Sequence, residues 1–359
     1  MSDSTLDQLR DRIDELDEII QGLLNERAAC AQQVAEAKKN NNDIVFYRPE
    51  REAEILRRVR GRNKGPLSDD EIVRLFREIM SACLALEQPL AVAYLGPEGT
   101  YTQTAAQKHF GHSVSLKPLA AIDEIFREVE AGSADFGVVP VENSTEGTIN
   151  HTLDMFIRSP LKICGDVELQ IHHQLLGGGN SLDQISSVQA HQQALAQCRE
   201  WLDANLPGVE RVAVSSNAEA ARLAQGDVSI AAIASDAAAE MYELDILASN
   251  IEDDPNNTTR FLVIGRQEVG PSGNDKTSLM VAVHNKSGAL YSLLEPIARH
   301  GVSMTKIESR PSRVSKWDYV FFVDVEGHVA DENVTAALKE LQTGASLFKV
   351  LGSYPRCEL

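Results

Sequence analysis

The first stretch of the chain is long, periodic and free of proline, and it limits the possible folds more than any other feature. From Asp3 to about Lys39 apolar residues recur at helical spacing. These residues are Leu6, Leu9, Ile13, Leu16, Ile20, Leu23, Leu24, Ala31 and Val34. At about 1.5 Å per residue such a helix extends on the order of 55 Å, well beyond the width of a small globule. The stripe therefore predicts a homodimer or higher homo-oligomer, in which a second subunit covers it.

The rest of the chain changes its pattern twice, which predicts three domains in these 359 residues. Helices are expected from Pro49 to Gly61 and from Ser68 to Glu87, so residues 1–89 form an all-α domain. Residues 90–268 alternate short apolar runs with helical stretches, which is typical of an α/β domain. Its expected strands are Val92 to Leu95, Val114 to Leu116, Phe136 to Val139, Val167 to Leu175, Val212 to Ser215, Ile230 to Ile233 and Phe261 to Ile264, and its expected helices lie near 102–110, 122–131, 192–204 and 217–225. Residues 275–357 follow the order strand, helix, strand, strand, helix, strand, which predicts an α+β ferredoxin-like domain.

Charge and cysteine content exclude several classes of function. The formal net charge is -19, and no basic stripe offsets it, so binding of nucleic acid or of anionic membranes is not expected. Five cysteines are scattered without a CxxC pair, which argues against disulfides and against a zinc site. The polar, acidic start Met1-Ser2-Asp3-Ser4 is unlike a signal peptide, and no run is long enough for a membrane helix. We expect a cytoplasmic protein.

The spacing of the cations on the first predicted helix shows which of them share a face. Eleven residues separate Arg27 from Lys38, which at about 100° per residue places both on one face, whereas Arg10 points elsewhere. A solvated charged face is the ordinary interpretation of such residues. Together with later positions, however, they resemble the active-site pattern of the all-helical chorismate mutase family. The matching positions are Arg10, Arg27, Lys38, Arg51, Glu52, Cys83 and Glu87.

The resemblance implies how chorismate is held. Arg27 and Arg51 bind its two carboxylates, Arg10 arrives from the partner subunit, and Glu52 takes the ring hydroxyl. A pericyclic rearrangement needs no nucleophile, only a folded conformer and charge stabilisation where the C–O bond breaks.

The ether oxygen of chorismate is faced by Lys38 and Glu87 in this resemblance, with Cys83 near by. Glu87 stands where bacterial relatives often have Gln, and Cys83 stands where Ser is common. A carboxylate facing a developing oxyanion helps only when it is protonated. The mutase reaction is therefore expected to weaken as pH rises through the pKa of Glu87, which substrate carboxylates raise.

Four polar motifs follow in the middle of the chain. They are GPEGTYT at 96–102, VVPVENSTEGT at 138–148, HQQALAQC at 191–198 and NNTTRF at 256–261. Each alone has an ordinary structural interpretation as a turn, a strand entry or a helix cap. In this order they resemble the prephenate dehydratase family, which implies two lobes with a cleft, like the bilobal solute-binding proteins.

The same resemblance assigns residues to prephenate. Thr259 is expected to assist departure of the ring hydroxyl, with Glu142 as a proton source. Arg260 is expected to hold the retained carboxylate, because a guanidinium fixes a carboxylate in two-point geometry. The other expected substrate contacts are Asn143, Ser144, Thr145, Gln197 and Phe261.

The last domain carries two motifs that resemble the effector-binding motifs of ACT domains in phenylalanine-regulated dehydratases. The first is Gly288-Ala289-Leu290, followed by Tyr291 where Val is usual. The second is Glu308-Ser309-Arg310-Pro311, which alone also suits a strand end and turn. Such domains pair across subunits and bind L-phenylalanine at the interface.

Together the motifs predict an enzyme that converts chorismate to prephenate and prephenate to phenylpyruvate, without metal or organic cofactor, under inhibition by phenylalanine. Two alternatives stay open. An arogenate-preferring dehydratase would use the same motifs, because the sequence does not show what reads the keto or amino group. A ligand sensor without turnover is the alternative from another class; the presence of Arg51, Glu52, Thr259 and Arg260 argues against it.

Overall fold

The computed structural model describes residues 3–40, 45, 47–179, 182–283, 287–311 and 319–357. Met1 and Ser2, part of the polar start of the chain, lie outside these residues. Clustering of the backbone divides the chain into two compact units. The first contains Met1–Leu90 with Phe110–Ser115, and the second contains Ala91–His109 with Leu116–Leu359. Searching the described residues finds no helix with the length and apolar character needed to cross a membrane.

The first unit is built on three helices, at the positions that the sequence predicts. They are α1 (Asp3–Asn40), α2 (Pro49–Arg62) and α3 (Asp69–Glu87). Proline occupies the first turn of α2, and the Ser68 hydroxyl caps α3 by accepting the Glu71 N–H at 3.2 Å. The C-terminal part of α1 packs on α3 and buries Ala35. The apolar residues of α1 from Leu6 to Leu24 remain exposed in this single chain.

The second unit begins with a six-stranded mixed sheet, whose order is β2-β1-β3-β11-β5 with β4 paired to β3. Its strands are β1 (Ala91–Leu95), β2 (Ser115–Leu119), β3 (Phe136–Asn143), β4 (Gly147–Thr148), β5 (Lys162–Gln170) and β11 (Thr258–Gly265). The helices of this first lobe are α4 (Tyr101–Phe110), α5 (Ile122–Ala131) and α6 (Asn150–Arg158). Helix α5 buries its apolar face, with Ile125 and Phe126, against the sheet.

A second lobe contains a five-stranded sheet with the order β10-β6-β9-β7-β8. Its strands are β6 (Gln174–Gly177), β7 (Ser187–His191), β8 (Glu210–Val214), β9 (Ile230–Ala234) and β10 (Asp245–Ala248). Its helices are η1 (Leu182–Gln184), α7 (Gln192–Gln197), α8 (Arg199–Asn205), α9 (Asn217–Ala224) and α10 (Asp236–Met241). Successive strand residues face opposite sides, so Leu175 packs with α7 and α8 while Leu176 packs with α9 and α10.

Two connecting segments join the lobes, and one of them corrects a prediction. The apolar run from Val167 to Leu175 suggests one strand, but the chain leaves β5 at Gln170 and enters β6 at Gln174. Residues 171–173 form one connection, and residues 249–257 form the other. They are bonded to each other: the Ile171 N–H donates to the Asn257 carbonyl at 2.7 Å. Helices α6 and α10 and strands β7 and β10 are also absent from the sequence-based assignment.

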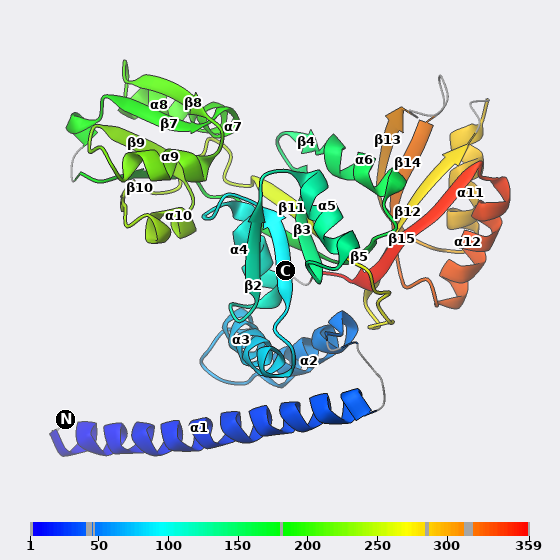
Figure 1. Cartoon of the computed structure of the whole chain (residues 1–359), viewed down its shortest axis with the longest axis horizontal. Helices are drawn as coiled ribbons and strands as arrows, with labels where there is room; N and C mark the ends of the chain where they lie inside the picture. Colours follow the sequence, from blue (N-terminus) through cyan, green and yellow to red (C-terminus); the bar gives the residue numbers. More distant parts are fainter. Residues whose placement is uncertain are drawn as a thin grey trace. The chain divides into compact units, whose positions relative to one another are not determined.

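The C-terminal part has the predicted ferredoxin-like order. Strands β12 (Asp275–Val283), β13 (Met304–Pro311), β14 (Tyr319–Glu326) and β15 (Leu347–Pro355) form an antiparallel sheet in the order β13-β14-β12-β15. Helices α11 (Ala289–Arg299) and α12 (Glu332–Gly344) lie on one face of this sheet (Figure 1).

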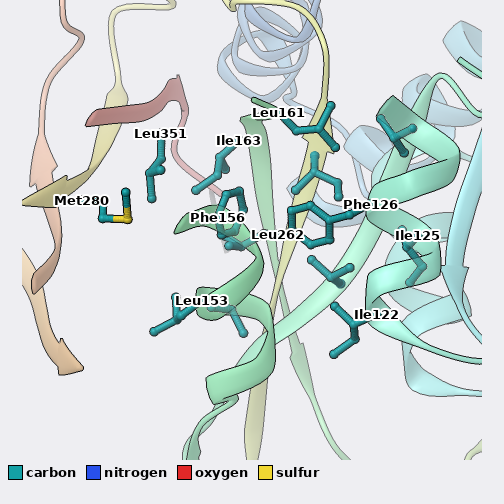
Figure 2. Packing of buried hydrophobic residues seen from close by; sticks show 14 of the residues in the cluster. Ile122, Ile125, Phe126, Leu153, Phe156, Leu161, Ile163, Leu262, Met280 and Leu351 are labelled. Atoms are coloured by element: carbon teal, nitrogen blue, oxygen red, sulfur yellow. The ribbon is translucent and has the colours of Figure 1, made fainter. Parts of the chain in front are cut away.

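The opposite face of the C-terminal sheet packs on the first lobe. Met280 and Leu351 lie beside Phe156 and Ile163 in one continuous apolar cluster (Figure 2). Gly352 makes this close approach possible, because a Cβ atom there would lie 2.1 Å from the Ile163 carbonyl oxygen. The sheet that contains β13, the strand of the second predicted effector motif, thus packs on the lobe that carries Thr259.

Candidate active sites

The helical unit brings three of the predicted mutase residues together. Glu87 at the end of α3 lies near Lys38 and Arg27 of α1, close enough for both cations to act on its ionisation. Its Oε2 atom is buried and accepts no hydrogen bond from the described residues. Burial raises the pKa of the Glu87 carboxyl, and Lys38 and Arg27 only partly oppose the shift. The group is thus prone to protonation, as a role beside a developing oxyanion requires.

Glu52 is a second carboxyl with a shifted pKa in this unit. Its side chain is only 19% exposed, and Arg77 lies 3.7 Å from it. Burial raises the pKa of Glu52 to about 7, although Arg77 and a hydrogen bond from Tyr47 lower it. Cys83 is buried on α3. Arg51 is mostly exposed and forms an ion pair with Glu54 at 2.5 Å.

Arg10 stays apart from this group in the single chain. Its side chain is 67% exposed, and its nearest ionic contact is Asp7, one turn away at 3.6 Å. Seventeen residues of one helix separate it from Arg27, a distance of about 25 Å along the axis. A contribution of Arg10 to a site that contains Arg27 would therefore have to come from another subunit.

Thr259 lies in a cluster of amides in the second unit. It is paired in register with Asn143 across β11 and β3, and the Asn143 Nδ2 donates to its Oγ1 at 2.8 Å. The Asn143 Oδ1 accepts the backbone N–H groups of Thr145 and Glu146, each at 3.0 Å. Because those two donors need an oxygen, they fix the orientation of the Asn143 amide.

The cluster continues towards the second lobe. The Asn143 Nδ2 also donates to the Asn257 Oδ1 at 2.8 Å, and the Asn257 Nδ2 donates to the Gln197 Oε1 at 3.3 Å. The Nε2 of His173 lies 2.9 Å from the same Gln197 oxygen. On its other side, the His173 Nδ1 lies 3.2 Å from the Tyr101 hydroxyl. The structure thus brings together Thr259, Asn143 and Gln197, as the sequence predicts.

Ser144 and Thr145 border this cluster. The Ser144 hydroxyl accepts the Thr258 N–H at 2.9 Å, and the Thr145 hydroxyl lies 3.5 Å from the Asn257 Oδ1. Phe261, by contrast, is only 2% exposed and contributes to the core of the lobe. Its ring is therefore part of the packing beneath the cluster, which differs from the expected substrate contact.

Arg260 departs from the sequence expectation. Consecutive strand residues face opposite sides, so its guanidinium points away from Thr259 and towards the C-terminal sheet. It donates to Asp166 at 3.0 Å, to Asp324 at 2.7 Å and to the Tyr354 hydroxyl at 3.0 Å. Only 11% of its side chain is exposed. Each guanidinium nitrogen donates one bond inside this buried cluster, so Arg260 is committed to the packing between the lobe and the C-terminal sheet and does not point into the Thr259 cluster.

Glu142 shares the face of Arg260, because the two residues are paired in register. Its carboxylate accepts from the Lys306 ammonium of β13 at 2.6 Å. The sequence expectation of a proton source beside Thr259 therefore does not match the direction in which Glu142 points. The Lys276 ammonium lies 2.7 Å from the Asp166 carboxylate. Burial raises the pKa of Asp166, but the nearby cations Arg260 and Lys276 outweigh it and leave that pKa below its usual value.

The two predicted effector motifs occupy different surroundings in the chain. Gly288, Ala289 and Leu290 line a cavity of ≈ 270 Å³ together with Tyr291 and residues of β12 and β14. In the second motif, Arg310 pairs with Asp154 of α6 at 2.9 Å, and Glu308 lines a separate hollow next to Arg260. Ser309 and Pro311 alternate with them and are exposed. Among the residues that the structure describes, the two motifs line different hollows.

Three members of the Thr259 cluster were not singled out from the sequence. Asn257 lies inside the motif 256–261, and Tyr101 lies inside the motif 96–102, so their positions were available as signals. His173 had no such signal, because the run around it resembles a continuous strand. No group of metal-binding side chains occurs among the residues that the structure describes.

Comparison with known proteins identifies the family. The sequence profile of chorismate mutase type II matches residues 9–88, that of prephenate dehydratase matches 92–269, and that of the ACT domain matches 277–342. The bifunctional chorismate mutase/prephenate dehydratase of Stutzerimonas stutzeri is 58% identical over 99% of this chain and 98% of its own. The protein of the same name from Pseudomonas aeruginosa is 56% identical over the same shares.

A solved structure points the same way for the second unit. The prephenate dehydratase of Arthrobacter aurescens in complex with L-Phe is 34% identical, with a TM-score of 0.69, over 74% of this chain and 90% of its own. The remaining part of the chain is the helical unit, which the mutase profile covers. The chain belongs to the bifunctional chorismate mutase/prephenate dehydratase family.

Proposed function

We propose that the chain converts chorismate to prephenate in its helical unit and prephenate to phenylpyruvate at the Thr259 cluster, and that L-phenylalanine inhibits the second reaction. The observation that carries the proposal is the contact between Asn143 and Thr259, at 2.8 Å within a cluster of amides. The Thr259 hydroxyl then lies in a polar site near the start of β11, an inner strand that a hydrophobic core holds in place.

In the mutase reaction, chorismate is held in its folded conformer by Arg27 and Arg51, while Lys38 and protonated Glu87 stabilise charge on the ether oxygen. Glu52 accepts a hydrogen bond from the ring hydroxyl of chorismate. Arg10 is supplied by a second subunit, since it does not reach the site of its own chain. The exposed apolar stripe of α1 supports such a homodimer, because contact with a second copy would bury it.

In the dehydratase reaction the ring carboxylate of prephenate leaves as CO2, and the electron pair of the broken C–C bond enters the ring. The ring C–O bond breaks in turn and its electron pair leaves with the hydroxide, which accepts a hydrogen bond from the Thr259 hydroxyl and takes up a proton from solvent to become water. Aromatisation drives the reaction. Asn143, Ser144, Thr145 and Gln197 surround the substrate. The ion pairs of Arg260 and Glu142 lie on the opposite face of the same strands and stabilise them there.

Feedback by L-phenylalanine rests on the third domain. Gly288, Ala289 and Leu290 line a cavity, and the similar dehydratase of Arthrobacter aurescens was solved with L-Phe. The four-stranded sheet shares a core with the lobe that carries Thr259, so a shift of β12, β14 or β15 acts directly on that lobe. Titrating phenylalanine against the dehydratase rate tests this part; a rate that stays constant up to millimolar phenylalanine contradicts it.

The two-step proposal is tested with chorismate as the only substrate and chromatographic separation of chorismate, prephenate and phenylpyruvate. The wild-type protein should end at phenylpyruvate. Thr259→Val should consume chorismate at the normal rate and accumulate prephenate. Thr258→Val is the matched control, because among the described residues the Thr258 hydroxyl bonds to the Asn256 carbonyl at 3.2 Å and to no member of the Thr259 cluster. Phenylpyruvate formation by Thr259→Val at the wild-type rate would contradict the assignment.

A further inference from the structure

The amide cluster around Thr259 has a single direction of hydrogen bonding. Backbone N–H groups hold the Asn143 oxygen, so its nitrogen donates to both the Thr259 Oγ1 and the Asn257 Oδ1. The Asn257 nitrogen must then face the Gln197 Oε1. A hydroxyl that accepts a hydrogen bond from Asn143 keeps its own proton for another partner. Thr259 is thereby set to donate outward, which is the polarity that a departing hydroxide requires.

At the other end of the cluster, around Gln197 and His173, the hydrogen bonds run in a consistent direction. The Gln197 oxygen faces the His173 Nε2 at 2.9 Å, so that nitrogen carries the proton and donates. Burial lowers the pKa of His173, which keeps the ring neutral near neutral pH with its Nδ1 towards Tyr101. One oxygen of Gln197 therefore accepts from two sides, and the amide cannot rotate without losing both bonds.

Two of the three cluster residues that the sequence did not single out lie on the connections between the lobes. His173 ends the first connection, 171–173, and Asn257 ends the second, 249–257. Asn257 is only 1% exposed, and its backbone carbonyl accepts the Ile171 N–H at 2.7 Å. A buried amide whose bonds are all matched is expensive to replace, because a lost partner leaves the others unsatisfied.

We propose that Asn257 and His173 are positioning residues for the dehydratase: from the connections between the lobes they fix the amides of Asn143 and Gln197, so that the Thr259 hydroxyl donates towards the substrate. This inference rests on the proposed role of Thr259 and extends it. Neither residue needs to touch prephenate. Their effect on the chemical step passes through the orientation of the Thr259 hydroxyl, so it falls mainly on turnover, and binding changes only as far as Asn143 and Gln197 contact the substrate.

A double-mutant cycle tests the proposal in the full-length protein. Asn257→Leu should lower kcat for prephenate by about 10- to 100-fold, in line with one or two lost hydrogen bonds to polar groups, while the Kd changes less than about threefold. In a Thr259→Val background the same substitution should have almost no further effect. Gln174→Leu is the matched control: this buried amide bonds to Asn250 near the same connections, outside the cluster, and its loss should leave kcat unchanged.

A second pair of variants tests the other end of the cluster and does not depend on folding of Asn257→Leu. His173→Gln places an amide nitrogen near the position of Nε2 and should keep most of the rate, whereas His173→Leu should lose it. Full additivity of Asn257→Leu with Thr259→Val, or equal losses in His173→Gln and His173→Leu, would overturn the proposal. If Thr259→Val itself keeps full activity, the proposed role of Thr259 fails instead, so the two failures are distinguishable.

Discussion

Replacing Arg260 with Met separates a structural role from a substrate contact. The buried guanidinium is shared by two carboxylates and a phenol. After its loss, Asp166 keeps Lys276 at 2.7 Å, but Asp324 keeps only the Ser278 hydroxyl at 2.6 Å. Removing one partner of a buried ion pair costs about 3–5 kcal/mol, since a charge is left without compensation. That loss is a large share of the ~5–15 kcal/mol by which domains are stable.

Urea unfolding and prephenate binding, measured on the same samples, make the test. With a slope of about 3 kcal/mol per molar, the unfolding midpoint of Arg260→Met should fall by roughly 1 M or more. Asp324→Asn keeps the shape of the cluster and should fall less. Arg222→Met is the control, because Arg222 is an exposed surface residue paired with Glu219, and its loss should leave the midpoint almost unchanged.

The binding measurement decides between the two roles of Arg260. A bond from a guanidinium to a substrate carboxylate contributes about 1.5–3 kcal/mol, so its loss would weaken prephenate binding roughly 10- to 150-fold. We expect a change in Kd well below tenfold, measured where the variant is folded. An unchanged urea midpoint together with a Kd raised tenfold or more would refute the reasoning and return Arg260 to the substrate.

Three other changes have defined outcomes. Glu87→Gln should extend mutase activity to higher pH: the raised pKa keeps the native carboxyl protonated at low pH, activity falls as pH rises through that pKa, and Gln cannot ionise. An alkaline fall-off identical to wild type in the pH–rate profile contradicts this. Leu16→Glu in the exposed stripe should shift sedimentation towards monomer and lower mutase activity by roughly 10-fold or more while dehydratase activity persists; a dimer with normal mutase activity would argue against the swapped arginine. Gly352→Ala places its Cβ against the Ile163 carbonyl and should lower the free energy of unfolding by about 1–3 kcal/mol. Gly344→Ala is the control, because open space surrounds Gly344. Equal melting curves for the two variants would show that the sheets can separate at little cost.

Local signals in the sequence were sufficient for the three helices of the first unit and for the C-terminal sheet. The proline at the start of α2 and the Ser68 cap of α3 act over one turn, and the structure uses both. The ferredoxin-like order follows from alternating patterns separated by short loops. The mutase cluster of Lys38 and Glu87 was reached only through family resemblance, because its members lie on helices whose packing the sequence does not state.

The direction of side chains on β11 was the main feature that sequence reasoning handled poorly. Adjacency of Thr259 and Arg260 suggested a shared site, yet residues i and i+1 of a strand face opposite sides. The period-2 rule was available, but the family resemblance assigns both residues to one substrate. The partners of Arg260 come from β5, β14 and β15, up to 94 residues away in sequence, and no local pattern reveals such a cluster.

The break between β5 and β6 could not be seen for a different reason. The apolar residues Val167, Leu169, Ile171 and Leu175 continue an alternating pattern through the connection. These residues are buried although no single strand runs through them, because the two connections bond to each other as neighbouring strands would. The alternating pattern therefore predicts burial correctly but predicts one continuous strand where there are two. It also gave no reason to single out His173.

The central claim is that the Thr259 hydroxyl assists departure of the ring hydroxide of prephenate, and single-turnover kinetics of Thr259→Ser and Thr259→Val test it most directly. Removing a group that assists proton transfer typically costs about 10²- to 10⁴-fold in rate. The account predicts that Thr259→Val loses at least ~100-fold in the dehydration step with prephenate Kd nearly unchanged, while Thr259→Ser, which keeps the hydroxyl, retains most of the rate. Equal rates for the two variants, or a loss in Thr259→Val that lies entirely in Kd, would contradict the claim.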